Sequence, residues 1–215
     1  MNRAFVRSLC VQVLVALLAG PALAADSEEE RKVDLDVFST GAKSGKLYLV
    51  GLEDGSRTHT HMKEMGYRRA VTRAREAAAG AVGTSFVFQQ KDGKDGTVTG
   101  VKVEGTAVMN EVSSGDLEGS SYLCAVVVVD RDAAMAPEDK KAFDAAKVIE
   151  VDVTYPAAGA RMVAPVSDAF LAGARKTCAG KSGSFNLRAW VDSMTRPEVK
   201  KSGEVVLHWK LRFAE

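Results

Sequence analysis

An alanine stripe along one predicted helix constrains the fold of this chain more than any other feature. From about His61 to Ala81, apolar residues recur at steps of three and four, a period of 3.6 residues that predicts a helix with one apolar face. That face consists of Met62, Met65, Ala70, Val71, Ala74, Ala77, Ala78, Ala81 and Val82. Because alanine has the smallest apolar side chain, we expect this helix to lie close against a β-sheet.

Strand patterns surround the helix. Tyr122 to Val129 is apolar on both faces and predicts a central, fully covered strand, whereas Val205 to Phe213 alternates and predicts a strand with one wet face. Further strands are expected at 46–50, 84–90, 149–155 and from Thr97 to about Asn110, with a glycine hairpin loop at 92–96 and another loop at 113–120.

Two more helices complete the pattern. One is expected from Glu138 to Lys147, another opens at Pro165, and residues 185–194 fit either a strand or a helix. This order predicts an α+β fold with mixed or antiparallel sheets, the alanine-rich helix on one face, and two βαββ-like halves. We expect a flexible segment at 25–45, an α+β domain at 46–131 and a smaller one at 148–215.

The first residues have the layout of a secretory signal. Arg3 and Arg7 precede a short apolar run, and Ala22-Leu23-Ala24 supplies small residues for cleavage near Ala24. We therefore expect a signal peptide at 1–24 and a mature protein that is periplasmic or secreted. No later segment reaches the roughly 20 apolar residues of a transmembrane helix, so none is expected in the mature chain.

The net charge of the chain argues against a nucleic-acid partner, and its length is sufficient for a folded core. The chain has 29 basic and 28 acidic residues, a net charge of +1, and loss of Arg3 and Arg7 with the signal changes this to −1. A nearly neutral protein lacks the long-range field that attracts nucleic acid, so no nucleic-acid partner is expected. The 191 residues left after removal of 24 from 215 are enough to bury a substantial core.

Two cysteines, Cys124 and Cys178, remain after the signal. In an oxidising compartment two thiols often pair, so a disulfide between them is one interpretation. The other is two separate buried thiols, because a free cysteine behaves as a small hydrophobic residue. The position of Cys124 within an apolar strand favours the second interpretation.

Two groups of side chains are candidate binding sites. His59 and His61 could share a metal ion if their segment is extended. However, no Asp, Glu or Cys follows at a spacing typical of a third ligand. The alternative is two surface histidines ahead of a helix. The row Arg68, Arg69, Arg73 and Arg75 could bind an anionic partner, or it could be the solvated face of the helix.

The sequence contains no pattern that announces catalysis. A nucleophile elbow of the form G-x-S-x-G is absent, and the glycines near 93–100 lack the Gly-Lys-Ser/Thr of a phosphate loop. We therefore expect that the protein has no catalytic residues, binds no cofactor and is not an enzyme.

A family resemblance rests on two stretches. Residues 67–83 form an Ala/Arg-rich helix that runs into a glycine, and 119–129 read Gly-Ser-Ser-Tyr-Leu-Cys-Ala followed by four valines. Residues 47–130 thereby resemble the N-terminal domain of flagellar assembly protein T and related small secreted lipoproteins. The resemblance implies a non-catalytic envelope protein, but no lipid-attachment cysteine follows the signal here.

Together these observations favour an exported, non-catalytic envelope protein that acts in assembly or in protein–protein interaction, with another envelope protein or with itself as the partner. An alternative is a periplasmic module for a small ligand, or a small hydrolase, with its site between the two halves.

Overall fold

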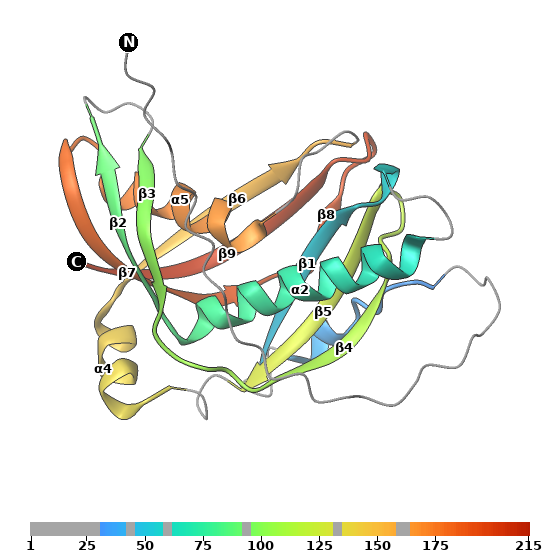
Figure 1. Ribbon diagram of the computed structural model, residues 1–215, viewed down its shortest axis with the longest axis horizontal. Helices are drawn as coiled ribbons and strands as arrows, with labels where there is room; N and C mark the ends of the chain where they lie inside the picture. Colours follow the sequence, from blue (N-terminus) through green and yellow to red (C-terminus); the bar gives the residue numbers. More distant parts are fainter. Residues whose placement is uncertain (1–30, 42–45, 58–61, 92–95, 131–134, 158–163) are drawn as a thin grey trace, which may run out of the picture.

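A computed structural model describes residues 31–41, 46–57, 62–91, 96–130, 135–157 and 164–215 (Figure 1). Its helices are α1 (Val37–Gly41), the 3-10 helix η1 (Gly55–Arg57), α2 (Lys63–Val82), α4 (Pro137–Ala145) and α5 (Pro165–Thr177). Its strands are β1 (Lys46–Asp54), β2 (Thr84–Gln90), β3 (Thr97–Val103), β4 (Met109–Asp116), β5 (Tyr122–Asp130), β6 (Lys147–Tyr155), β7 (Gly183–Met194), β8 (Glu198–Val199) and β9 (Val205–Ala214).

The strands form two sheets, and every pairing between them is antiparallel. The small sheet has the order β1-β5-β4, and the large sheet has the order β3-β2-β7-β9-β6, with β8 added beside β9. Strand β5 is central in the small sheet and buried along nearly its whole length, as the apolar run 122–129 predicts. The α+β class and the antiparallel sheets are thus confirmed.

Helix α2 lies on the small sheet, with β1 and β5 beneath it (Figure 1). Its buried face includes Ala70, Ala74, Ala77, Ala78 and Ala81, each with no exposed surface. Directly under the helix, a Cβ on Gly51 of β1 would overlap the backbone carbonyl oxygen of Ala70 and the amide nitrogen of Ala74. Helix and strand backbones therefore touch, which only small side chains on both elements permit.

The two predicted halves share one sheet and one core. Strands β2 and β3 come from the first half, yet β2 pairs along seven residues with β7 of the second half. A single hydrophobic cluster includes Leu49 and Val126 from the small sheet together with Leu207 and Phe213 from the large sheet. The boundary predicted within 131–147 therefore separates neither two sheets nor two cores.

Two segments differ from the expected strand boundaries, and for a third the structure decides between strand and helix. The strand expected from Thr97 to Asn110 is broken at 104–108, where the chain passes from the large sheet to the small one. The loop expected at 113–120 begins as strand, because β4 continues to Asp116 by pairing with β5. Residues 185–194 lie in a strand, since β7 is paired with both β2 and β9.

Part of the segment expected to be flexible has a defined place. Residues 31–33 pair with the end of β4 through a parallel bridge between Lys32 and Asp116: the Asp116 amide donates to the Arg31 carbonyl, and the Val33 amide donates to the Asp116 carbonyl. A Cβ on Gly115 would collide with the backbone of residues 31–33, so glycine is required there. Helix α1 follows and contacts β1, whereas residues 25–30 and 42–45 lie outside the described part of the chain.

The helix-to-strand contact predicts a large effect of one methyl group. We expect Gly51→Ala to lower the free energy of unfolding by about 3 kcal/mol or more, because the added Cβ meets backbone that cannot move aside. Gly180→Ala is the matched control: it has open space and a φ of 76°, so only the backbone preference is lost, about 1 kcal/mol. Urea unfolding of both variants measures the difference, and equal losses would contradict the close contact.

Candidate functional site

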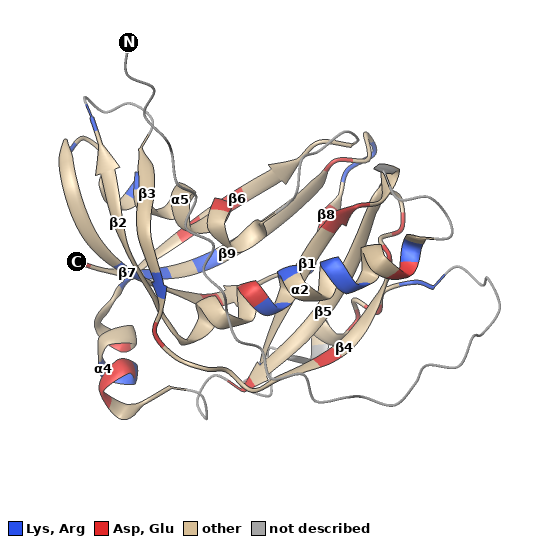
Figure 2. Cartoon of the chain, in the orientation of Figure 1, with Lys and Arg blue, Asp and Glu red and all other residues tan. Residues whose placement is uncertain are grey.

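The arginine row of α2 is largely used in ion pairs within the protein. Arg68 is paired with Glu64, Arg69 with the largely buried Glu53, and Arg73 with Glu76. Among the described residues only Arg75 of the four forms no ion pair. Figure 2 shows both signs of charge along the exposed face of the helix. This balance matches a solvated helix face and leaves little unpaired positive charge for an anionic partner.

The candidate metal ligands His59 and His61 lie outside the described residues. Within the part of the chain that the structure describes, no three His, Cys, Asp or Glu side chains cluster as a metal site would require. The remaining histidine, His208 on β9, lies between two carboxylates. Its Nδ1 is 2.8 Å from Asp152 Oδ1 on β6, and its Nε2 is 3.4 Å from Glu198 Oε2 on β8.

Cys124 and Cys178 are free thiols in the structure, and both are fully buried. Cys124 is near the start of β5, and Cys178 follows the last turn of α5. Burial raises the pKa of both thiols, so neither is a ready nucleophile. Of the two interpretations of these cysteines, the structure contains separate buried thiols and no disulfide between them.

The two halves meet at a pair of tyrosines. Tyr122 of β5 and Tyr155 of β6 lie edge to face, with ring centroids 6.5 Å apart. The Tyr122 hydroxyl donates to the Pro156 carbonyl at 2.7 Å, and the Tyr155 hydroxyl donates to Asp168 Oδ2 at 3.2 Å. Burial raises the pKa of Tyr122 to about 12. Both hydroxyls are engaged in hydrogen bonds, and the bond of Tyr122 joins the two halves at the place where the alternative function would require a site.

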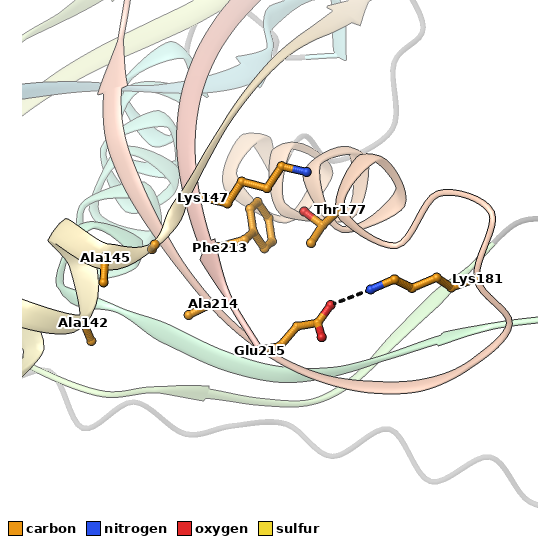
Figure 3. A pocket seen from close by; sticks show the side chains of 9 residues that line it. Ala142, Ala145, Lys147, Thr177, Lys181, Phe213, Ala214 and Glu215 are labelled. Atoms are coloured by element: carbon orange, nitrogen blue, oxygen red, sulfur yellow. Dashed lines mark hydrogen bonds and ion pairs between the residues drawn. The ribbon is translucent and has the colours of Figure 1, made fainter.

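A groove of about 530 Å³ lies elsewhere, in the second half alone (Figure 3). It is lined by residues from the ends of α4, α5 and β9 and the start of β6, with Phe213 and several alanines among them. Three of its polar groups already have partners: Lys181 is paired with Glu215 at 3.1 Å, and the Thr177 hydroxyl donates to the Gly173 carbonyl. These groups do not converge on one point as the groups of a catalytic site do.

The outstanding surface feature is an apolar edge that joins the two sheets. Among the described residues six large apolar side chains are exposed, and four of them lie between 101 and 112: Val101 (52%), Val103 (44%), Val108 (80%) and Val112 (37%). We call residues 97–112 the β3–β4 edge. Here the chain runs along β3, the last strand of the large sheet, and then into β4, the last strand of the small sheet (Figure 1).

Two bulges shape the β3–β4 edge. In β3 the pairing with β2 shifts between Ser85 and Val87, and Gly100 has a φ of 63°, a conformation that glycine adopts without strain. In β4 the pairing with β5 shifts between Glu111 and Ser113, which leaves Val112 in the bulge.

Charged side chains fix the outer face of this edge. Glu104, just after β3, accepts a hydrogen bond from Ser85 of β2 and forms an ion pair with Arg188 of β7. Arg188 also donates to Asp139 of α4 at 2.7 Å and lies over the Trp190 ring. Lys102 is on the same face as Ser85, its partner in the strand pairing, and among the described residues it forms no ion pair.

Sequence reasoning missed this edge because it treated 97–110 as one strand. The signal was present: Glu104-Gly105-Thr106-Ala107 interrupts the alternation between Val103 and Val108. An interruption of four residues can mark either a bulge within one strand or a passage from one sheet to another. In the second case the valines on either side of the interruption lie at sheet edges, where no neighbouring strand covers them.

Known proteins give no guide to this surface. No family model matches the chain, and neither a curated protein nor a solved structure matches it. Among the described residues no helix combines the length and apolar character needed to cross a membrane.

The state of the cysteines can be checked directly. We expect a chain that lacks residues 1–24, denatured without reductant, to react with a thiol reagent at both Cys124 and Cys178, because the structure holds them apart as free thiols. In the native protein the same reaction should be slow, since both sulfurs are buried and their pKa values are raised. Fewer than two reactive thiols after denaturation would show a disulfide instead.

His208 predicts a pH dependence of stability. Its pKa is raised, chiefly by the hydrogen bond with Asp152 and further by Glu198. A raised folded-state pKa contributes stability below the ordinary value of about 6.5, and this contribution is lost as the pH rises through the raised value. We expect the melting temperature to fall more between about pH 6 and pH 8 in the wild type than in His208→Gln. Identical profiles would refute this role.

Proposed function

We propose that this chain is exported and acts in the cell envelope as a non-catalytic binding protein, with the β3–β4 edge as its contact surface. Three lines support the proposal: the secretory layout of residues 1–24, the resemblance of residues 47–130 to the N-terminal domain of flagellar assembly protein T and related small secreted lipoproteins, and the exposed valines. The valines carry most weight, because large apolar side chains exposed together along one segment of a surface are typical of an interaction site.

The shape of the edge fits recognition of a protein better than recognition of a small ligand. Small-molecule sites are concave and bury most of the ligand. The β3–β4 edge is the rim of two sheets, and every residue of β3 except Val98 is exposed. Strand edges bind extended protein segments through main-chain hydrogen bonds, with alternate side chains providing specificity.

The test is site-specific photo-crosslinking of the full chain in its native host. A photoreactive residue in place of Val108 should form a covalent adduct with a second protein, because this side chain is 80% exposed on the edge. Val148, 41% exposed on β6, is the matched control position. Equal adducts at Val148, or none at Val101, Val108 and Val112, would overturn the proposal.

The same cells test the compartment. The protein should fractionate with the envelope or the periplasm, and its first residue should lie just after Ala24. A chain that still begins at Met1 in the cytosolic fraction would exclude the envelope role whatever the crosslinking shows.

A further inference from the structure

We infer that the partner of β3 is a second copy of this chain, which pairs antiparallel with it about a two-fold axis at Val103. The inference rests on the proposed function and identifies one occupant of the β3–β4 edge. Three features of β3 support it. Backbone groups of β3 point away from β2, its charged and apolar side chains lie on opposite faces, and the charges of one copy complement those of a second copy.

The first feature is the backbone of β3 at Val103, whose N–H and C=O groups bond to no neighbouring strand among the described residues. The Glu104 amide donates to the Gly83 carbonyl at 3.0 Å, and Val103 is opposite Thr84. In an antiparallel ladder residues alternate between bonding with their partner strand and pointing away from it. The N–H and C=O of Val103 therefore point away from β2, toward an edge where the described residues place no further strand.

Side chains divide between the two faces of β3. Lys102 and Glu104 are on the outer face with Ser85, as the strand register and the Ser85–Glu104 hydrogen bond show. Val101 and Val103 are on the opposite face, because successive side chains of a strand alternate. A partner strand must therefore match charges on one face and offer apolar side chains on the other.

A second copy meets both requirements in one register. With the axis at Val103, Lys102 of each copy is opposite Glu104 of the other, which adds two cross-strand pairs of opposite charge. Val103 is then opposite its own copy, and Val101 is opposite Gly105, so that apolar groups gather about the axis. Lys102, which has no ion pair among the described residues of the single chain, gains one in the dimer.

Neighbouring registers are disfavoured by the same residues. With the axis at Lys102, the two Lys102 ammonium groups would be directly opposite each other, a destabilising arrangement. Beyond Val101, the bulge at Gly100 turns the strand and ends regular pairing. The ladder is therefore confined to residues 101–105. Because it is short, we expect a dimer that dissociates on dilution.

Sedimentation velocity of the mature chain over a wide range of concentration tests the dimer. The wild type should pass from monomer to dimer, and Lys102→Glu should raise the dissociation constant about tenfold or more, because a carboxylate would then be opposite the Glu104 carboxylate of the other copy. Lys201→Glu makes the same change of charge in the exposed turn before β9 and should leave the dissociation constant unchanged. Circular dichroism of each variant checks that the fold is retained.

Disulfide trapping tests the register. Under oxidation Val103→Cys should form a disulfide-linked dimer, since the paired Cα atoms of an antiparallel ladder are about 5.5 Å apart, within bridging range. Val101→Cys should not, because the two sulfurs would be several residues apart along the ladder. Equal crosslinking of the two variants would overturn the register.

A wild type that stays monomeric at all concentrations, or a Lys102→Glu variant that associates as strongly as Lys201→Glu, would overturn the dimer. Photo-adducts at Val108 to a different protein would in that case leave the proposed function standing. Absence of any adduct would remove both.

Discussion

The contact between Gly51 and the backbone of α2 is the constraint on which the rest of this structure depends. A helix normally stands off a sheet by the thickness of two layers of side chains. Here one layer is absent on the strand and reduced to methyl groups on the helix, so that the Ala70 carbonyl comes directly over β1. Close contact of this kind maximises dispersion attraction between backbones, and any larger side chain at either position would separate them.

This close contact lets α2 serve both sheets. One face of the helix covers β1 and β5, and its C-terminal part reaches β7 and α5. Gly80 continues the same principle: a Cβ there would press on Val166 and Phe170 of α5. The helix thus joins the first half of the chain to the second, and the β2–β3 hairpin that follows it completes the large sheet. A single core results from a sequence that reads as two similar halves.

The same arrangement leaves β3 as an edge strand of the large sheet. Neither α2 nor α5 extends far enough to cover its valines, while the outer face is fixed by Glu104, Arg188 and Asp139. The edge is therefore exposed on its apolar side and anchored by ion pairs on its charged side, and anchored side chains lose little conformational entropy on binding. Because one face of β3 is charged and the other is apolar, only a partner strand with matching faces can pair with it.

Much of the fold could be predicted residue by residue. Period-3.6 and period-2 patterns placed α2, β2, β6 and β9 within a few residues, because burial on one face dictates which residue types recur. A continuous apolar run placed β5, because that strand is buried on both faces. The ends of β3 and β4 and the nature of residues 185–194 were not predictable in this way. Those depend on whether a neighbouring strand is present to complete a ladder, and that neighbour is remote in the sequence.

For the candidate sites the division is sharper. By itself the sequence determined the amphipathic helix, the apolar central strand, the near-zero charge and the secretory layout of its first residues, since each is a property of local composition and spacing. Only the tertiary structure decided that Arg68, Arg69 and Arg73 are neutralised within the protein, that the two cysteines stay apart, and that four valines face solvent. Exposure and pairing depend on which distant segments meet, and spacing along the chain carries no record of those distances.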